Sequence, residues 1–435
     1  MPGTLVVRSH QLGEGAVPDA LLRTLPADPT AVAWMRGGQG LVGWGVAARL
    51  EVSGPDRFTR AARWWSQLTA AAVVRDDVAV PGSGLVALGS FAFADGPSSS
   101  VLVVPRVLLG RRDGRVWVTT VASGPALPAP PPLPVRPTPP PGPPVGLAFA
   151  DGARSGPEWV AAVVTALDRI TAGALDKVVL ARDLLAVTDE PVDLRWPAER
   201  LAAAYPTCWT YLVDGLVGAT PEMLVRLEHG LVTSRVLAGT IRRTGDETAD
   251  AALAGRLARS SKDLEEHEYA VRSVAEALAP HCSSMNVPES PFVLHLPNVM
   301  HLATDVTGVL GPAGDPATTP EDPAVRALAA RPLQLASALH PTAAVAGTPT
   351  TAAEALISEL EGMDRGRYAG PVGWLDAHGN GEWGIALRCA ATDPADPRRL
   401  RLFAGCGIVA GSDPQAELAE SNAKLVPVRD ALGAG

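Results

Sequence analysis

Residues 208–240 read CWTYLVDGLVGATPEMLVRLEHGLVTSRVLAGT, and this stretch carries the clearest indication of the fold in the 435-residue chain. Runs of apolar and β-branched residues alternate with short breaks that contain turn-forming residues. One of these breaks, Asp214-Gly215, is a dipeptide typical of a tight two-residue hairpin. The stretch therefore predicts three strands joined by tight turns, and hence an antiparallel arrangement.

Strand and helix patterns are mixed on both sides of this stretch. Short apolar runs broken by glycine and charged residues predict strands up to about residue 122, with one helix at residues 56–73. Further along, residues 156–173 predict a helix and residues 177–187 predict a strand. Three more strands are expected at residues 368–376, 381–391 and 400–412. Because hairpin-like gaps outnumber βαβ crossovers, the sequence predicts a large α+β protein with mainly antiparallel strands.

A proline-rich segment at residues 125–146, PALPAPPPLPVRPTPPPGPPVG, interrupts these patterns. Such a density of proline favours an extended connector with little regular structure. The segment separates a strand-rich N-terminal portion, residues 1–124, from a second portion, residues 147–435. A surface loop within one unit, a linker between domains and a ligand for an SH3 domain are all compatible with it.

The composition and charge of the chain argue against several classes of function. The formal net charge of -9 argues against a protein that wraps nucleic acid or an anionic membrane. No run approaches the ~20 apolar residues of a transmembrane helix, and the N-terminus lacks a basic-then-apolar signal pattern. Widely spaced cysteines favour reduced thiols in a cytoplasmic protein over a disulfide or zinc set. These cysteines are Cys208, Cys282, Cys389 and Cys406.

Two predicted helices each carry a pair of carboxylates one turn apart. Glu417 and Glu420 share one face of the C-terminal helix with Lys424, and Asp263 and Glu266 have the same spacing in an earlier helix. Taken alone, each pair fits a solvated charged face. Together, two helices that present carboxylates fit the preference of Mg²⁺ for a few oxygen ligands. The histidines and cysteines form no HExxH or CxxC pattern, so no soft-metal site competes.

Ten segments occur in an order that resembles the chorismate-utilising enzymes. They are KVVLAR, GATPEML, LAGTIRR, KDLEEHEYAV, HLATDVTG, LHPTAAVAGTP, RGRYAGPVGWLD, GEWGIALR, AGCGIV and SDPQAELAESNAK. The resemblance spans roughly residues 147–432, and within the family it is greatest to the isochorismate synthases. It implies two packed sheets with helices outside, a deep central cleft and a requirement for Mg²⁺. It also implies that residues 125–146 form a loop within one compact unit.

The resemblance implies a reaction and assigns proton transfer and metal binding to named residues. The reaction replaces the C4 hydroxyl of chorismate with a new hydroxyl at C2, taken from water. Lys177 matches the general base that deprotonates this water, and Glu222 matches the general acid that protonates the departing hydroxyl. Glu266 and Glu420 match the two glutamates that hold Mg²⁺. The residues that match partners bound through the waters of the metal are Asp263 and Glu417.

Other matched residues are expected to bind the substrate. Arg388 matches the residue that holds the enolpyruvyl carboxylate, and a planar guanidinium suits such a two-point contact. Tyr368 is expected at the same carboxylate, His301 near a ring hydroxyl, and Lys424 at the substrate or the waters of the metal. Glycines are expected where the backbone approaches the ligand closely. These glycines are Gly239, Gly405 and Gly407.

Ala344 separates possible chemistries within the family. Salicylate synthases and the amine-using members tend to carry threonine here, so Ala344 favours an enzyme that stops at isochorismate. A salicylate synthase, an anthranilate or aminodeoxychorismate synthase component and an inactive binding subunit are the alternatives. No glutaminase segment is visible in the sequence. Chorismate is the partner expected, the size of the chain is compatible with a monomer, and the product could serve menaquinone, siderophore or salicylate synthesis.

Overall fold

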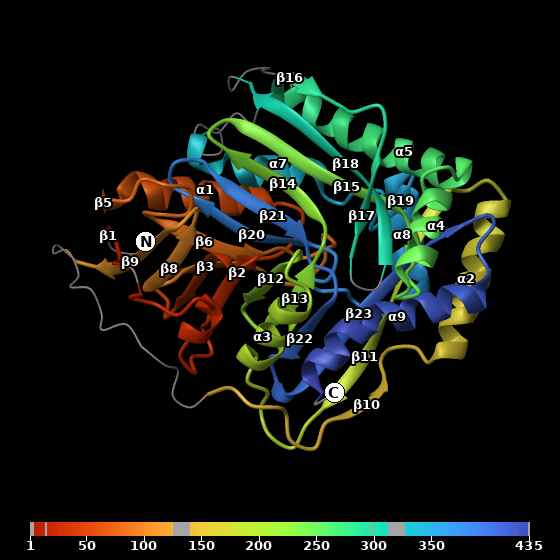
Figure 1. Cartoon of the computed structure of the whole chain (residues 1–435), viewed down its shortest axis with the longest axis horizontal. Helices are drawn as coiled ribbons and strands as arrows, with labels where there is room; N and C mark the ends of the chain where they lie inside the picture. The colour runs from red at the N-terminus through yellow and green to blue at the C-terminus, as the bar shows by residue number, and fades with distance from the viewer. Residues whose placement is uncertain (1–3, 14, 125–139, 297–298, 312–326, 434–435) are drawn as a thin grey trace.

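The computed structural model describes residues 4–13, 15–124, 140–296, 299–311 and 327–433, apart from the side chains of Lys262 and Glu266. Two β-sheets pack together in the centre of the molecule, and helices surround them (Figure 1). Strand pairing is antiparallel, as in the long pair β11–β23, with a parallel pair between β1 (Leu5–Gln11) and β5 (Val73–Asp76). The predicted α+β fold with mainly antiparallel sheets is therefore confirmed.

The larger sheet has thirteen strands among the described residues. Their order begins with strands that follow the proline-rich segment and ends with strands that precede it. It runs β10 (Ala148–Asp151), β11 (Lys177–Val187), β23 (Asp396–Val409), β22 (Cys389–Asp393), β13 (Leu216–Thr220), β12 (Trp209–Val213), β2 (Val32–Arg36), β3 (Gln39–Trp44), β8 (Val107–Arg112), β9 (Arg115–Ser123), β1 and β5, with β19 (Gly347–Thr348) paired to β11.

The smaller sheet has ten strands in the same part of the chain, and it too combines strands from both halves. Its order is β16 (Cys282–Asn286), β18 (Val299–Leu310), β15 (Leu231–Arg242), β14 (Met223–Glu228), β21 (Gly381–Ile385), β20 (Pro371–Asp376), β6 (Val86–Ser90), β7 (Ser100–Val104) and β4 (Ala48–Val52), with β17 (Phe292–His295) paired to β18.

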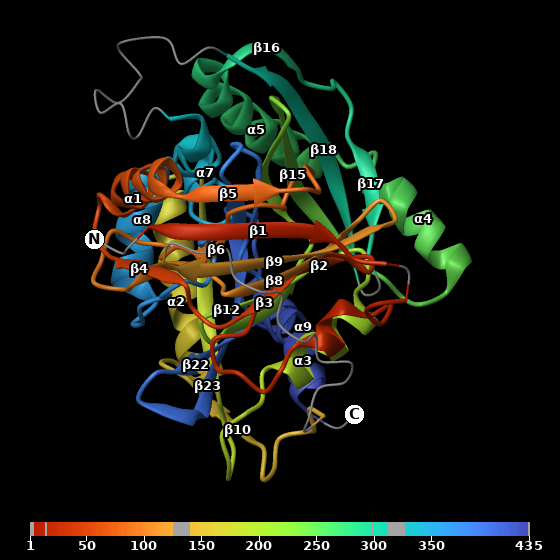
Figure 2. The same cartoon turned by 90° about the vertical axis from the view of Figure 1, so that its left-hand side faces the viewer.

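Helices lie around the outside of the paired sheets, as the two perpendicular views show (Figure 2). None of those described is long and apolar enough to cross a membrane. The helices are α1 (Arg57–Ala71), α2 (Gly156–Thr171), α3 (Arg195–Ala204), α4 (Glu247–Leu257), α5 (Ser261–Leu278), α7 (Arg331–Leu339), α8 (Thr350–Leu360) and α9 (Pro414–Leu432).

Both halves of the chain contribute to one continuous core. Trp65 and Trp117 from residues 1–124 and Trp159 and Trp383 from residues 147–435 are at most 1% exposed and belong to the same cluster of packed side chains. Strand β2 pairs with β12, and β6 pairs with β20, so each sheet is built across the predicted border. The division at residues 125–146 itself stays a prediction, because most of that segment lies outside the described residues.

Helix α9, which carries Glu417 and Glu420, begins with an aspartate cap followed by a proline. The Asp413 side chain accepts a hydrogen bond of 2.8 Å from the backbone N–H of Ala416, and Pro414 occupies the first turn. An aspartate cap satisfies a backbone donor that has no partner within the helix, and proline needs none there. The cap fixes the start of α9 and therefore the direction in which its first-turn carboxylates point.

The strand predictions were wrong at two places. Three strands were predicted in residues 208–240 and one strand in residues 381–391. The first stretch contains four strands, because the chain leaves the larger sheet after β13 and enters the smaller sheet at β14, with Pro221 and Glu222 between them. Proline lacks the N–H that would continue a ladder, which favours a break at this point. The second stretch is likewise divided into β21 and β22, which belong to different sheets.

These two sheet crossings lie beside each other. Strand β13 pairs with β22 on one side of the crossing, and β14 pairs with β21 on the other. The backbone N–H of Ile385 donates to the carbonyl of Glu222 at 3.1 Å, and that of Ala219 donates to the carbonyl of Arg388 at 3.2 Å. The crossings therefore bring Glu222 and Arg388 together where the two sheets meet.

The four cysteines are all unpaired, and only Cys282 among them is partly exposed.

Candidate active site

A cavity of about 240 Å³ opens where the two sheets meet. Its walls come from the start of β11, the crossing after β13, the end of β15, helix α5, the segment before β19, the crossing before β22, strand β23 and helix α9. Thirteen of the fourteen residues expected at the site line it: Lys177, Glu222, Gly239, Asp263, His301, Ala344, Tyr368, Arg388, Gly405, Gly407, Glu417, Glu420 and Lys424.

Glu266 is the remaining residue of that set. It lies on α5, one turn after Asp263, but its side chain is outside the part of the chain that the structure describes. Its expected contact with a metal therefore stays a prediction. Asp263 lines the same cavity as Glu417 and Glu420, so α5 and α9 both contribute a carboxylate to the walls of this cavity.

Glu222 is a buried carboxyl group, 7% exposed, that faces this cavity. Burial is the largest influence and raises the pKa of Glu222 to about 7, although the nearby cations Lys177, Arg388 and Lys424 act in the opposite direction. A carboxylic acid that keeps its proton close to neutral pH can donate it to a leaving group. The environment of Glu222 therefore suits the role of a general acid.

Lys177 is the first residue of β11, and Gly407 on the neighbouring strand β23 leaves room for its side chain. A Cβ atom added to Gly407 would lie 3.0 Å from Cε of Lys177. Gly405 and Gly239 have the same relation to other site residues, since an added Cβ would lie 3.0 Å from Oη of Tyr368 and 3.2 Å from Cβ of Asp263, respectively. These three glycines line the cavity as expected, and they also leave the space that its functional side chains occupy.

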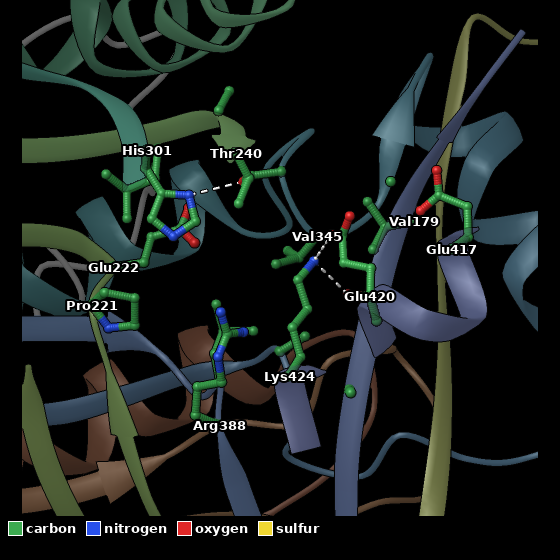
Figure 3. Close-up of a pocket in the computed structure, with 18 of the residues that line it drawn as sticks. Val179, Pro221, Glu222, Thr240, His301, Val345, Arg388, Glu417, Glu420 and Lys424 are labelled. Atoms are coloured by element: carbon green, nitrogen blue, oxygen red, sulfur yellow. Dashed lines mark hydrogen bonds and ion pairs between the residues drawn. The ribbon is translucent and has the colours of Figure 1, made fainter. Parts of the chain in front are cut away.

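Glu417 and Glu420 project from α9 on the other side of the pocket from Glu222 (Figure 3). Lys424 lies between, pairs with Glu420 at 2.6 Å, and donates a hydrogen bond of 3.0 Å to the carbonyl of Gly405. Burial alone would raise the pKa of Glu420, but the positive charges of Lys424 and Arg388 outweigh it and the pKa is lowered. Glu420 is therefore kept as a carboxylate, the form that binds a cation.

The donor set at this end of the cavity fits a hard divalent cation. Glu417 and Glu420 offer carboxylate oxygens, which Mg²⁺ prefers, Asp263 adds a carboxylate elsewhere on the wall, and the open cavity leaves room for water and substrate oxygens. The ligand atoms of Glu417, Glu420 and Cys406 lie within 4.8 Å of one another. Burial raises the pKa of the Cys406 thiol to about 12, so the oxygens are the available anionic ligands.

Arg388 has an unusual backbone and a guanidinium group that faces the cavity. Its φ is +49°, a left-handed conformation that places the side chain at the sheet crossing. Within the described residues this guanidinium makes no hydrogen bond or ion pair to another side chain. Tyr368 lies in the same cavity with its ring stacked on Phe403 at 5.1 Å. A guanidinium and a phenol that face the same cavity suit the binding of a carboxylate.

Thr240 and Arg365 are among the residues that line the cavity but were not expected from the sequence. Thr240 lies on β15 and hydrogen-bonds to His301, with 2.9 Å between its Oγ1 and Nδ1 of the ring. Arg365 lies in the same RGRYAGP segment as Tyr368, which was the one signal that could have identified it. Its guanidinium donates to the carbonyls of Val345 at 2.8 Å and Val179 at 2.7 Å, and so joins two walls of the cavity.

The ion pair of Arg365 with Glu361 is buried, with side-chain exposures of 2% and 1%. Replacing Glu361 by alanine is expected to lower the free energy of unfolding by about 3–5 kcal/mol, because the arginine is left buried without its counter-charge. Urea unfolding followed by tryptophan fluorescence measures this. Glu359 is the matched control, since its pair with Arg169 is about half exposed and its loss should cost less than about 1 kcal/mol. Equal effects of the two substitutions would contradict the prediction.

Comparison with known proteins agrees with this arrangement. A family model described as "Chorismate binding enzyme" matches residues 30–124 and 151–433. A putative isochorismate synthase of Mycobacterium tuberculosis is 42% identical over 272 residues, which make up 60% of this chain and 68% of that protein. A salicylate biosynthesis isochorismate synthase of Pseudomonas aeruginosa is 34% identical over 413 residues, with 90% of this chain and 82% of that protein covered.

A solved structure is similar over nearly the whole length. It is a putative 2,3-dihydroxybenzoate-specific isochorismate synthase from Bacillus anthracis, with a TM-score of 0.72, 28% identity, and coverage of 94% of this chain and 97% of that chain. The residues that the family model matches include all those that line the cavity. The chain therefore belongs to the chorismate binding enzyme family.

Proposed function

We propose that this chain is an isochorismate synthase that uses Mg²⁺ to convert chorismate to isochorismate. The observation that carries the proposal is the grouping, in one cavity, of Lys177, a Glu222 that holds its proton near neutral pH, and two cations, Arg388 and Lys424. The relatives named isochorismate synthase support the same activity. An inactive binding subunit would have no need for a carboxyl group with a raised pKa.

Two of these residues would carry out the proton transfers, one at the attacking water and one at the departing hydroxyl. Lys177 removes a proton from water as its oxygen forms a bond to C2 of chorismate. Glu222 gives its proton to the C4 hydroxyl as the C4–O bond breaks and water leaves. Arg388 and Tyr368 hold the enolpyruvyl carboxylate and fix the ring between acid and base, and such positioning lowers the entropy cost of reaction.

The carboxylates of α5 and α9 are the residues that would hold the metal. Glu420 and Glu266 would bind it directly, with Asp263 and Glu417 bound through its waters. When bound, Mg²⁺ supplies positive charge that neutralises and orients the ring carboxylate of the substrate. The ion pair with Lys424 holds the Glu420 side chain in place. The carboxylate that would bind the metal is therefore already positioned in the metal-free protein.

Analysis of the product tests the proposal. Purified enzyme is incubated with chorismate and Mg²⁺, and the products are separated by chromatography. Isochorismate is expected as the main product, in keeping with Ala344 in place of a threonine. Salicylate as the main product, anthranilate in the presence of ammonia, or unchanged chorismate would each overturn it.

Removal of the metal has a separate expected result. EDTA should lower turnover by about two orders of magnitude or more, because several kcal/mol of charge stabilisation at the substrate are lost. Adding Mg²⁺ in excess over the chelator should restore the rate. Calorimetric titration should also show weaker chorismate binding in the chelated enzyme. Full activity after exhaustive chelation would exclude the metal from the reaction.

A further inference from the structure

Helix α5 carries one side of the expected metal site and packs against strands β15 and β18 of the smaller sheet (Figure 1). Asp263 lines the active-site cavity from the first turn of this helix, and Glu266 follows one turn later. His267, the next residue, is 2% exposed and begins the buried face of the helix. The rest of that face is a stripe of apolar side chains: Ala270, Val271, Val274 and Leu278. A histidine in an apolar stripe needs polar partners, because an unpaired buried polar group is costly.

Both ring nitrogens of His267 are hydrogen-bonded to the smaller sheet. Nδ1 lies 3.3 Å from the carbonyl oxygen of Ala238 on β15, and Nε2 lies 2.7 Å from Oγ1 of Thr304 on β18. A carbonyl oxygen can only accept, so Nδ1 donates in this pair. In the neutral ring Nε2 then accepts from the Thr304 hydroxyl. The histidine therefore joins α5 to two neighbouring strands at once, which an apolar side chain of the same size could not do.

The contact with Ala238 lies beside a β-bulge. Gly239 is one extra residue of β15 in its pairing with β18, and its φ of +76° is readily adopted only by glycine. A Cβ atom added to Gly239 would lie 3.2 Å from Cβ of Asp263, so the helix approaches the bulge closely. Two consecutive residues of β15 therefore contact α5 at positions one turn apart, Gly239 at Asp263 and Ala238 at His267.

The direction in which α5 presents its carboxylates depends on how the helix is held against the sheet. Groups that bind a metal must stay within about 0.5 Å of their productive geometry. Apolar packing is non-directional, whereas hydrogen bonds have a preferred length and angle, so they fix the rotation of a helix more sharply. The described residues that line the cavity do not include His267. Its ring therefore acts on the site through the helix and not by touching a ligand.

We propose that His267 is a positioning residue for the metal. Its hydrogen bonds to Ala238 and Thr304 hold α5 on the Gly239 bulge in the rotation at which the carboxylates of its first turns serve Mg²⁺. This inference rests on the proposed function for the identity of the metal, and it assigns no step of the reaction to His267. Part of the metal affinity then depends on a contact between α5 and the sheet that lies outside the cavity.

Metal binding by a His267→Leu variant tests the positioning role without any turnover. Leucine continues the apolar stripe but makes neither hydrogen bond. Mn²⁺ is titrated into metal-free protein, the unbound ion is measured by electron paramagnetic resonance, and Mg²⁺ is then added as a competitor. The affinity for both ions should fall about 10–100-fold, the range typical of losing a group that orients metal ligands. Unchanged affinity would overturn the inference.

A control on the same helix separates positioning from a general loss of stability. Leu278 is 1% exposed at the far end of the apolar stripe, about four turns from Asp263. Leu278→Ala leaves a cavity under α5, so it should lower the urea midpoint of unfolding and keep the wild-type affinity for Mn²⁺. If Leu278→Ala bound Mn²⁺ as weakly as His267→Leu, any loosening of α5 would suffice and the specific role of His267 would be overturned.

Variants that remove one hydrogen bond at a time test the two contacts, whether or not the leucine variant folds well. His267→Asn keeps a donor for the Ala238 carbonyl and should bind Mn²⁺ more tightly than His267→Leu. Thr304→Val removes the hydroxyl that meets Nε2 and should weaken binding by itself. In the His267→Leu protein it should add little, because both changes remove the same contact. Additive effects, or an asparagine variant no better than leucine, would overturn the hydrogen bonds as the cause.

Steady-state kinetics distinguish failure of this inference from failure of the proposed function. In His267→Leu the Mg²⁺ concentration that gives half the maximal rate should rise about 10–100-fold, while kcat at saturating Mg²⁺ stays close to the wild-type value. A kcat that stays low at saturating Mg²⁺ would overturn the positioning role. A wild-type product other than isochorismate would overturn the proposed function alone, and a wild type that binds neither Mn²⁺ nor Mg²⁺ would overturn both.

Discussion

Replacing Lys177 with alanine is expected to lower kcat by about 10²–10⁴-fold, the range that a general base contributes. The alanine cannot accept a proton from the attacking water, and no other described lysine lines the cavity except Lys424, which is engaged with Glu420. Chorismate should still bind, because the carboxylate contacts of Arg388 and Tyr368 are unchanged. Steady-state kinetics and calorimetric titration of chorismate measure the two effects separately.

The control for this variant is a cation outside the cavity. Arg169 on α2 is about half exposed and pairs with Glu359, so Arg169→Ala should keep the wild-type rate. Lost binding together with lost turnover in Lys177→Ala would assign Lys177 to substrate binding. An unchanged rate would remove it from the mechanism altogether.

Replacing Glu222 with glutamine should have a similar effect on rate and a distinct effect on the pH profile. The amide keeps the shape of the side chain but has no acidic proton to give, so kcat should fall by about 10²–10⁴-fold. In the wild type, the pKa of about 7 means that the acid is protonated below this pH and ionised above it. Wild-type kcat/KM should therefore decline as pH rises through about 7.

The residual rate of Glu222→Gln should lack this alkaline decline, because glutamine does not ionise. Glu228 is the matched control, a partly exposed glutamate at the far end of β14, the strand that follows Glu222, and it pairs with Arg112 at 2.9 Å. Glu228→Gln should keep both the rate and the pH profile of the wild type. If Glu222→Gln showed the same decline near neutral pH as the wild type, another group would be the acid.

The type of fold could be predicted because antiparallel hairpins have local sequence signals, namely a turn dipeptide and alternating apolar residues. The Asp214-Gly215 turn and the alternation around it predicted a hairpin, and β12 and β13 form one. The prediction failed at residues 221–222 and 386–388, where one apolar run supplies strands to two different sheets. Nothing in local composition tells a continuous strand from one that changes sheet, since both sides of the break are buried.

Site residues that belong to a recognisable sequence motif could be predicted. Features of the site that depend on the folded geometry could not. The resemblance grouped Lys177, Glu222 and Arg388, and the structure places all three in one cavity. Thr240 was missed because its orientation depends on the extra residue at Gly239, which a strand pattern does not reveal. The raised pKa of Glu222 depends on burial by segments distant in sequence, so it could not be calculated from the motif that contains it.

The crossings between the sheets have a consequence for how this protein can be recombined with its relatives. Glu222 and Arg388 lie at two of the points where the chain passes from one sheet to the other, so the reaction centre is built from both sheets. A chimaera that exchanged a whole sheet would have to cut the chain at these two points among others, and would then combine an acid and a carboxylate-binding arginine from differently positioned backbones. Functional hybrids should therefore arise from breakpoints elsewhere, such as the peripheral hairpin β8–β9, where no reacting group is severed from its neighbour.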